Sequence, residues 1–308
     1  MRILVTGGCG FIGSHLVDEL IKQGHRVVVV DNLSTGKKEN LNHKARFYQI
    51  DIQDPEISQI FQKEKPEVVF HFAAQIDVRK SVEDPMSDAK INILGSLNLI
   101  QDFIQVSGHK KFIFASSGGA IYGDTNVIPT PEGHLENPES PYGITKLTVE
   151  KYLWFYKKAY GLDYLSLRLA NVYGPCQNSK GEAGVVAIFA DKMLSGSQPI
   201  INGSGCQTRD FVYVKDVVES ALLAMKKEKS GIYNIGTAKE TSINEIFRKI
   251  KELTGSNCQE IHGPEKPGEQ KRSCLDYSKA KKELNWQPKY NLEEGLKETV
   301  KWFKEHLS

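Results

Sequence analysis

The feature that most constrains the fold of this chain is a glycine-rich turn between an apolar strand pattern and an amphipathic helix pattern. Residues 2–6 read RILVT, residues 6–16 read TGGCGFIGSHL, and residues 26–31 read RVVVVD. Short continuous apolar runs separated by helical periodicity are typical of parallel strands covered on both faces. The order strand, helix, strand therefore predicts a βαβ unit at the N-terminus.

The glycines of this turn have the spacing of a phosphate-binding loop, GxxGxxG. A tight turn and a close backbone approach to a pyrophosphate both require glycine, and the N-terminus of the next helix offers free N–H groups to the anion. A glycine turn without a ligand is the alternative. We expect a dinucleotide, held at its pyrophosphate by Gly7, Gly10, Phe11, Ile12 and Gly13.

Acidic residues end the second and third predicted strands. Asp31 follows the glycine turn by about 20 residues, where a carboxylate accepts hydrogen bonds from ribose hydroxyls and repels a 2′-phosphate. We therefore expect NAD rather than NADP. Asp51 either contacts the adenine edge or caps the helix that follows it. Cys9, within the turn, is either a reactive thiol or a small residue tolerated there.

The alternation continues to about residue 172. Strands are expected at 46–51, 66–74, 111–117 and 163–169, and helices at 55–64, 86–108 and 141–161. Beyond Asn171, glycine, proline and asparagine become frequent and short strands mix with helices. The pattern predicts an α/β fold with a doubly wound parallel sheet over 1–172 and a smaller mixed α/β lobe over 173–308. Residues around 209–236 are expected to return to the first domain.

A tyrosine and a lysine open the helix that starts at Pro141. Proline suits the first turn of a helix, and Tyr142 and Lys146 are four positions apart, so they lie on one face. Most pairs at this spacing are ordinary neighbours on a helix surface. Only the context of the pair favours a catalytic interpretation.

Three features in this order resemble the extended short-chain dehydrogenase/reductase family, which is marked by a Tyr-x-x-x-Lys pair. They are TGGCGFIG with Asp31, a strand ending in SSGGAIYG, and YGITK. Within that family the chain resembles the nucleotide-sugar 4-epimerases nearly from end to end, through DNLSTG, HFAA, RLANVYGP, QTRDFVYVKDVV and YNIG. The resemblance implies a Rossmann-type fold and interconversion of UDP-glucose and UDP-galactose, by transient oxidation at C4 with bound NAD.

The resemblance also assigns roles at the site. Tyr142 would be the general base. Lys146, with the positive nicotinamide ring close by, would lower the pKa of Tyr142, and Lys146 would also hold the nicotinamide ribose. Further contacts with NAD would come from Asn32, Ser34, Gly36, Asp51, Ile52, Phe72, Ala73, Ala74, Asn92 and Ser116.

One position departs from the family pattern. A Ser or Thr hydroxyl that shares the proton relay is usual where this chain has Gly118. Either Ser117 substitutes from one residue earlier, or Tyr142 works without a serine partner. Adjacent strand residues point to opposite faces, so the substitution needs a local irregularity, which the Gly118-Gly119 pair would permit. Gly119-Ala120 also replaces the Asp-Glu pair of the sugar-nucleotide 4,6-dehydratases, which argues against that reaction.

The C-terminal lobe would hold the nucleotide sugar. The resemblance places Asn171 and Arg209 on the diphosphate, and Asp216 is expected to cap its helix. Lys266 and Glu269 stand where the family has an arginine and an acid for phosphate and ribose, with Arg272 as possible support. The substrate contacts expected in this lobe are Asn171, Gly184, Val185, Arg209, Lys266, Glu269 and Ser273.

Ser273 occupies the position that walls the sugar pocket beside the 2-substituent. A bulky tyrosine there accompanies restriction to plain hexoses in the family, whereas a small residue leaves room for an acetamido group. The resemblance therefore implies activity on UDP-N-acetylglucosamine and UDP-N-acetylgalactosamine as well.

Composition limits the remaining choices. A net charge of +2 gives no reason to expect nucleic acid, and no apolar stretch is long enough for a bilayer. Five scattered cysteines without a CxxC pair favour neither disulfides nor a metal site and fit a reducing cytoplasm, and no cleavable leader is expected. The helices around 86–106 and 141–160 suggest a homodimer.

Two alternatives to a 4-epimerase remain. One is another extended short-chain dehydrogenase that acts on a nucleotide sugar, namely a dehydratase, decarboxylase or reductase. The other is a non-catalytic NAD-binding regulator.

Overall fold

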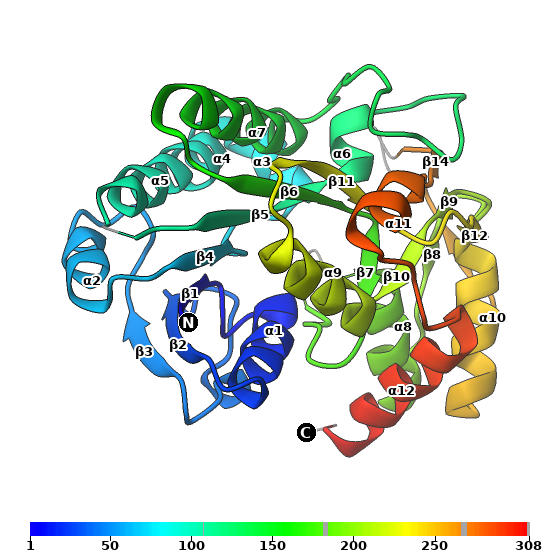
Figure 1. The fold of residues 1–308 in the computed structure, drawn as a ribbon. Helices are drawn as coiled ribbons and strands as arrows, with labels where there is room; N and C mark the ends of the chain where they lie inside the picture. The colour runs from blue at the N-terminus through cyan, green and yellow to red at the C-terminus, as the bar shows by residue number, and fades with distance from the viewer. Residues whose placement is uncertain (107, 181–183, 266–269, 307–308) are drawn as a thin grey trace.

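A parallel sheet of seven strands forms the centre of the molecule in the computed structural model, which describes residues 1–106, 108–180, 184–265 and 270–306 (Figure 1). Its strand order is β11-β6-β5-β4-β1-β2-β3, which is the doubly wound order extended by one strand. The strands are β1 (Arg2–Thr6), β2 (Arg26–Asp31), β3 (Arg46–Gln49), β4 (Val68–His71), β5 (Lys111–Ser117), β6 (Tyr164–Leu169) and β11 (Gly231–Ile235).

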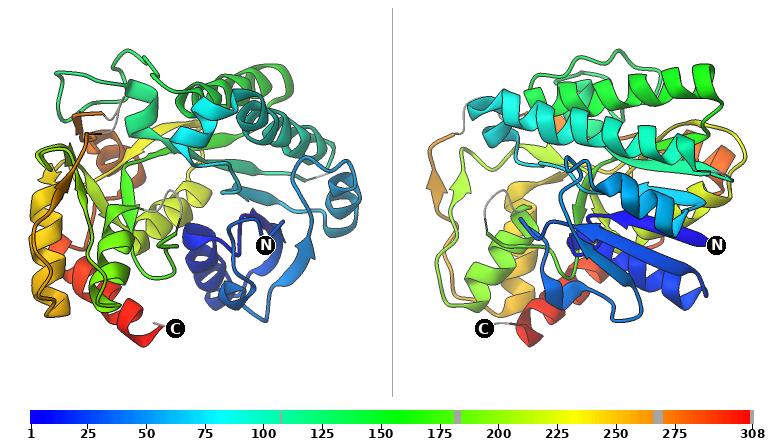
Figure 2. Two further views of the ribbon diagram at one scale, coloured as in Figure 1. Left: turned by 180° about the vertical axis from the view of Figure 1, so that it is seen from behind. Right: turned by 90° about the vertical axis from the view of Figure 1, so that its left-hand side faces the viewer.

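Helices cover both faces of this sheet, as the apolar strands require. On one face lie α1 (Phe11–Lys22) and α9 (Val214–Lys226), and on the other α2 (Ile57–Glu64), α5 (Gly95–Gln105) and α7 (Pro141–Tyr160) (Figures 1 and 2). Alternate strand residues point to the two faces, so each face has its own buried apolar cluster. The predicted fold class is confirmed.

The start of α7 is set by local chemistry. The Ser140 hydroxyl accepts a hydrogen bond from the Gly143 N–H at 3.1 Å, and Pro141 occupies the first turn. At the other end Gly161 adopts the left-handed conformation, with a φ of 71°. These two ends fix where Tyr142 stands relative to the sheet.

The predicted helix at 86–108 is interrupted. It begins as α4 (Pro85–Ala89), widens to a π-helical turn, η2 (Lys90–Leu94), and continues as α5. Alpha helices α3 (Val78–Glu83) and α6 (Gly118–Tyr122) and the short 3-10 helix η1 (Lys38–Asn40) lie in connections that the sequence pattern does not mark as helical.

The C-terminal lobe has a separate apolar core, built by α8 (Val185–Leu194), α10 (Ile243–Thr254) and α12 (Leu292–Glu305). Its strands pair in both directions: β9 (Thr208–Arg209) is parallel to β14 (Arg272–Ser273) and antiparallel to β12 (Thr241–Ser242). The other elements are β7 (Asn171–Tyr173), β8 (Ile201–Asn202), β10 (Phe211–Tyr213), β13 (His262–Gly263) and α11 (Ser278–Leu284).

Between these lobe segments the chain returns to the large sheet. Helix α9 packs beside α1, and β11 pairs with β6 at the sheet edge. The sequence suggested that Asp216 caps α9. Asp216 does lie in the first turn of that helix, but its side chain does not cap it. Its carboxylate accepts hydrogen bonds from the backbone N–H groups of Lys289 (3.0 Å) and Tyr290 (3.2 Å), so it holds the approach to α12 instead.

Within the described part of the chain, none of the helices is both long and apolar enough to cross a lipid bilayer.

Candidate active site

The glycine turn is packed so closely that side chains are excluded. A Cβ on Gly13 would lie 2.1 Å from the carbonyl oxygen of Gly7, and a Cβ on Gly7 would lie 2.8 Å from the nitrogen of Ala73. Gly7 also has a φ of +70°, which glycine adopts without strain. No described side chain caps the start of α1 after Gly10, so the first N–H groups of the helix remain available to an anion.

Asp31 lies against this turn at the end of β2. It is buried, and its two oxygens accept hydrogen bonds from the backbone N–H groups of Cys9 (2.9 Å) and Leu33 (2.8 Å). A Cβ on Gly36 would come within 2.9 Å of the same carboxylate, so glycine is needed there. Each oxygen keeps a lone pair for a further donor, as a ribose hydroxyl would supply.

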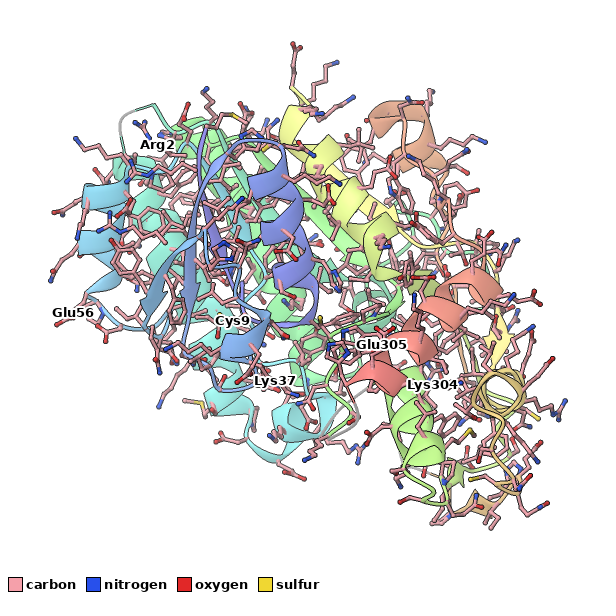
Figure 3. All side chains as sticks on the ribbon, turned by 90° about the horizontal axis from the view of Figure 1, so that it is seen from below. Arg2, Cys9, Lys37, Glu56, Lys304 and Glu305 are labelled. Carbon is pink, nitrogen blue, oxygen red and sulfur yellow. The ribbon has the colours of Figure 1, made fainter. Side chains whose placement is uncertain are left out.

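The segment after β2 crosses over the glycine turn. The Lys37 N–H donates to the carbonyl of Cys9 at 3.0 Å, and the two residues lie close together in Figure 3. Burial raises the pKa of the Cys9 thiol to about 12, with a further rise from Asp31. The thiol therefore stays protonated, which favours its interpretation as a small residue over a reactive one.

Asp51 meets Asn32 at the end of β3. The Asn32 amide donates to one carboxylate oxygen at 2.6 Å, and the Gln53 N–H donates to the other at 2.8 Å. Asp51 does not cap α2, so that alternative is wrong. The Ser34 N–H donates to the Asn32 oxygen at 3.0 Å, which orders the segment beside Asp31.

Phe72, Ala73 and Ala74 follow β4 directly and pass over the glycine turn, since Gly7 abuts the Phe72-Ala73 backbone. The Ala73 N–H donates to the Thr6 hydroxyl at 3.2 Å, and Thr6 is hydrogen-bonded to the His71 ring. Burial lowers the pKa of His71 to about 3, so this ring is neutral. His71 serves as a structural residue of the strand.

Tyr142 and Lys146 share the buried side of α7, as their spacing predicts. The ammonium lies 5.8 Å from the centre of the Tyr142 ring and 4.8 Å from that of Phe114. It donates a hydrogen bond to the carbonyl of Ala115 at 2.9 Å. The helix thus brings the phenol and the ammonium to the carboxyl end of β5.

The Ser117 hydroxyl lies near enough to the Tyr142 phenol to lower its pKa by hydrogen bonding. The sequence required a local irregularity for this contact, and the end of the strand provides it. Strand β5 ends at Ser117, and α6 begins at Gly118. A Cβ on Gly118 would lie 2.5 Å from the Leu275 side chain. The usual hydroxyl position is therefore filled from the other lobe, and Ser117 is the hydroxyl that reaches Tyr142.

The net effect of the chain's own residues is to raise the pKa of Tyr142. Burial raises it to about 12, the Ser117 hydrogen bond lowers it in part, and the charge of Asp88 raises it. We expect Lys146 and the nicotinamide ring together to lower this pKa. The residues of the chain by themselves leave it raised, because desolvation of the phenolate is the largest contribution. Burial also lowers the pKa of Lys146, to about 8, against the raising effect of Asp88 and Glu150.

Ser116 and Asn92 differ in what they leave free. The buried Ser116 hydroxyl has no hydrogen-bond partner among the residues that the structure describes, as expected of a group that contacts a ligand. Asn92 instead uses its amide within the chain: its oxygen accepts from the Gln75 N–H, and its nitrogen donates to the Gln75 carbonyl and to Asp88, all at 2.9 Å. Ile52 is buried against Gly95.

On the lobe side, Asn171 is exposed at the start of β7 and Arg209 is half-buried in β9. Gly184 and Val185 form the start of α8, which no described side chain caps. Ser273 pairs in register with Arg209, and its hydroxyl would be 2.8 Å from a Cβ on Gly119. The lobe strand β14 therefore touches the turn that follows Ser117.

Two predicted substrate residues, Lys266 and Glu269, lie outside the described residues. Arg272, the residue considered as support for Lys266, forms a two-point ion pair with Glu240 through its guanidinium, at 2.9 and 2.5 Å.

Sequence reasoning named Asn92 but missed two buried polar residues on the same side of its helix, Asp88 and Ser96. Asp88, Asn92 and Ser96 recur every four residues on the buried side of one helix, a polar stripe that could have drawn attention to them. It also missed Asp210, a buried carboxylate that accepts from the N–H groups of Thr237 (2.8 Å) and Leu275 (3.2 Å) and so joins the lobe to Gly118.

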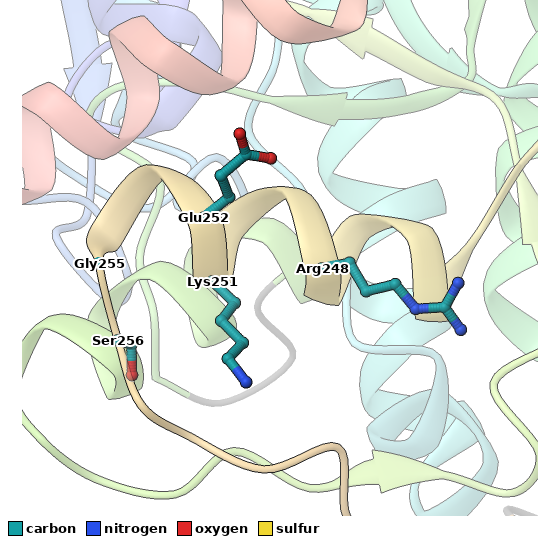
Figure 4. A pocket seen from close by; sticks show the side chains of 5 residues that line it. All are labelled: Arg248, Lys251, Glu252, Gly255 and Ser256. Atoms are coloured by element: carbon teal, nitrogen blue, oxygen red, sulfur yellow. The ribbon is translucent and has the colours of Figure 1, made fainter.

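A shallow pocket elsewhere in the lobe contains none of the predicted site residues. It lies over the C-terminal half of α10 and is lined by Arg248, Lys251, Glu252, Gly255 and Ser256 (Figure 4). Among the described residues no group of three or more His, Cys, Asp or Glu side chains could hold a metal ion.

Comparison with known proteins identifies relatives over the whole length. The model of the NAD-dependent epimerase/dehydratase family matches residues 3–236. A putative UDP-glucose 4-epimerase of Methanocaldococcus jannaschii is 49% identical over 98% of each chain. The structure of UDP-glucose 4-epimerase from Thermotoga maritima with UDP-glucose has a TM-score of 0.98 at 53% identity over 100% of both chains. That of Thermus thermophilus UDP-glucose 4-epimerase with NAD has a TM-score of 0.95 at 42% identity, over 99% of this chain and 100% of that one.

Proposed function

The chain belongs to the NAD-dependent epimerase/dehydratase family, and on that premise we propose that it is an NAD-dependent UDP-glucose 4-epimerase. It interconverts UDP-glucose and UDP-galactose by transient oxidation at C4. The observation that carries this function is that Tyr142, the Lys146 ammonium and the Ser117 hydroxyl come together at the end of β5. Relatives with solved structures bind UDP-glucose and NAD.

The residues of the first domain fit NAD. The closed glycine turn, the uncapped start of α1 and the two open lone pairs of Asp31 suit a pyrophosphate and a ribose that carries both hydroxyls. The unpaired Ser116 hydroxyl supplies a further donor. The residues proposed to hold NAD are Gly7, Gly10, Phe11, Ile12, Gly13, Asp31, Asn32, Ser34, Gly36, Asp51, Ile52, Phe72, Ala73, Ala74, Asn92, Ser116, Tyr142 and Lys146.

When bound, NAD supplies the oxidation and the re-reduction of the sugar at C4. Tyr142 takes the proton of the 4-hydroxyl and gives it back on the other face of the sugar. Because burial holds the pKa of this phenol near 12, its phenolate needs stabilisation. Lys146 supplies positive charge, and Ser117 donates a hydrogen bond to the phenolate oxygen.

The substrate would be held mainly by its nucleotide. Asn171 and Arg209 lie on the lobe strands β7 and β9. The start of α8 at Gly184 and Val185, which no described side chain caps, suits an anion. Lys266 and Glu269 complete the proposed set. A firm grip on UDP with few contacts to the hexose would let the 4-keto sugar turn over.

A dehydratase on the same scaffold is less well supported. Elimination at C5–C6 requires an acid and a base next to the relay hydroxyl, and this chain has Gly119 and Ala120 there. A reductase would consume NADPH, which Asp31 disfavours. A non-catalytic regulator would have no need of the Tyr142–Lys146 pair.

Ser273 supports a wider sugar range. It is small and lies against Gly119, beside the turn that carries Ser117. We infer that UDP-N-acetylglucosamine and UDP-N-acetylgalactosamine are also interconverted, because a serine leaves room for an acetamido group where a tyrosine would fill it. Wild type and Ser273→Tyr are compared on both substrate pairs. Failure of wild type on the N-acetylated pair, or undiminished activity of the variant on it, would contradict this range.

A homodimer is proposed from the outer surface of the helices around 86–106 and 141–160, which lie side by side (Figure 2). Apolar residues are exposed there, namely Met86, Leu94, Ile144, Tyr152 and Phe155. An exposed apolar patch of this kind marks an interaction surface. Light scattering at micromolar protein should give twice the mass of 34.5 kDa, and a monomer mass would refute the dimer.

Two further assignments are proposals. The five cysteines are all unpaired, which supports a reducing, cytoplasmic location. We propose residues 1–172 as the NAD domain and 173–308 as the nucleotide-sugar lobe, with the segment around 209–236 packed on the first domain.

The test of the function is product analysis. Purified protein is incubated with UDP-glucose, and UDP-galactose is expected at equilibrium without added NAD, because the cofactor is regenerated. Loss of water or carbon dioxide from the nucleotide sugar would favour the alternative enzymes. No turnover of any UDP-sugar by NAD-loaded protein would favour the regulator.

A further inference from the structure

We propose that Asp88 is a positioning residue of the redox site, whose buried carboxylate joins the loop after β4 to α7 and holds negative charge beside Lys146. The inference rests on the function proposed for Tyr142 and Lys146, and it adds a residue outside the tyrosine–lysine pair. Asp88 lies in α4, and only 1% of its surface is exposed.

Three neutral donors from three segments converge on this carboxylate. One oxygen accepts from the side-chain amides of Gln75 and Asn92, each at 2.9 Å. The other accepts from the hydroxyl of Thr145, also at 2.9 Å. Thr145 immediately precedes Lys146, so the carboxylate is fixed to the turn of α7 that carries the ammonium.

The helix geometry supports the same junction. The π turn η2 begins just after α4 and contains Asn92, and π turns of this kind are frequent at functional sites. Asn92 stands one turn beyond Asp88 and binds both backbone groups of Gln75. Asp88 and Asn92 together therefore hold the loop that leaves β4 against α7.

The charge of Asp88 is not offset by its partners, because all three are neutral. Burial in a low dielectric strengthens its effect on nearby charges. Glu150, the other carboxylate close to Lys146, is instead paired with the buried Arg168 at 2.6 Å. The titratable groups that face Lys146 are Tyr142 and Glu150 on α7, Asp88 on α4 and the neutral His71 on β4.

Negative charge at Asp88 favours the ammonium form of Lys146 and disfavours the phenolate of Tyr142, so it raises the pKa of both groups. Removing the charge should lower both. A purely structural role would disturb activity without moving the two pKa values together in this direction.

Asp88→Asn removes the charge and keeps the shape. The new amide oxygen can accept from Gln75 and Asn92, while the amide nitrogen donates to the Thr145 hydroxyl. Thr145 can then direct its own hydrogen to the Tyr142 carbonyl, which lies 3.0 Å away. Thr145→Val is the matched control, because it deletes a neutral hydrogen bond and retains the carboxylate.

The direct readout is the titration of Lys146 in protein labelled with ¹³C-lysine, with the signal assigned by its absence in Lys146→Met. Exposed lysines titrate near 10.4, well above the wild-type pKa of about 8 expected for Lys146. Asp88→Asn should lower that pKa by roughly one unit, and Thr145→Val should leave it near the wild-type value. Both limbs of the pH–rate profile should move to lower pH in Asp88→Asn only.

An unchanged or raised Lys146 pKa in folded Asp88→Asn, or an equal shift in Thr145→Val, would overturn the proposal. Thermal melting verifies folding, and if Asp88→Asn does not fold, the neutral and smaller Asp88→Ser is titrated instead under the same criterion. Tyr142→Phe is assayed in parallel. Near-normal epimerisation in Tyr142→Phe would end the proposed function itself. If Tyr142→Phe is inactive but the Lys146 pKa does not move in Asp88→Asn, only the role of Asp88 would be ended.

Discussion

The two lobes of the molecule build their halves of the site in different ways. In the NAD domain the key groups are buried and fixed by backbone contacts, as with Gly13, Asp31 and Lys146. In the nucleotide-sugar lobe Asn171 is exposed and Arg209 half-buried, on strands of two or three residues. Oxidation and reduction at C4 need one fixed geometry of the reacting groups. The sugar must present both of its faces to those groups, so it needs a less confining lobe.

The lobes meet where both are rigid. Leu275 fills the space beside Gly118, and the buried Asp210 accepts a hydrogen bond from the Leu275 N–H. Ser273, two residues earlier, lies against Gly119. These contacts hold the turn after Ser117 from the side of the nucleotide-sugar lobe. Changes in either lobe should therefore affect Tyr142 through them.

The largest effect is expected at the centre of the NAD domain. Tyr142→Phe should lower kcat for epimerisation by ~10²–10⁴, because it removes the general base and leaves the packing unchanged. NAD should remain bound, as measured by absorbance of the purified protein. Tyr160→Phe, at the exposed end of the same helix, is the control and should be unaffected.

A second change tests whether the rigidity of that domain is required. Gly13→Ala places a Cβ 2.1 Å from the Gly7 carbonyl, so the turn must move, at a cost of about 1–3 kcal/mol in the free energy of unfolding. Retained NAD should fall sharply. Gly133→Ala meets no atom within 4 Å and serves as the control. Equal NAD retention in both variants would show that the packed turn does not hold the cofactor.

The sequence predicted the sheet and the shared helix face of Tyr142 and Lys146 well, and the substrate lobe less fully. Strand β5 and the start of α7 follow from a continuous apolar run and a Ser-Pro cap, both of which are local signals. Tyr142 and Lys146 are identified by the family resemblance, by their spacing of four residues and by the proline in the first turn of their helix. The family and the NAD cofactor inferred from these motifs are confirmed by the comparisons.

What the sequence could not supply depends on contacts between distant segments. Leu275 behind Gly118, the Asp88–Thr145 junction and the Arg272–Glu240 pair each join residues far apart in the chain. The burial that raises the pKa of Tyr142 could not be read from the sequence either, because spacing reveals a neighbouring charge but not the desolvation that opposes it.

A third, smaller effect is expected at Ser117, where the two lobes come together. Ser117→Ala removes the hydrogen bond that lowers the pKa of Tyr142, so the acidic limb of the pH–rate profile should move to higher pH. The rate at neutral pH should fall about tenfold. An unmoved profile would show that the glycine at position 118 leaves Tyr142 without a serine partner.

The smallest effect is expected in the substrate lobe, at Arg272. Its ion pair with Glu240 is exposed, so Arg272→Ala should change KM for UDP-glucose by about threefold or less. Arg209→Ala, in the adjacent strand β9, should raise KM by about tenfold or more if it binds the diphosphate. Steady-state kinetics distinguishes the two variants by their KM values. A larger increase in KM for Arg272→Ala than for Arg209→Ala would place the phosphate site at β14.

The most direct test of the central claim follows the hydrogen at C4. UDP-glucose deuterated at C4 is incubated with the purified protein in ordinary water, and the UDP-galactose formed is analysed by mass spectrometry and NMR. Because the proton handled by Tyr142 belongs to the hydroxyl and the C4 hydrogen is returned within the site, the product should retain deuterium at C4. UDP-galactose in which C4 carries hydrogen from water would contradict the account.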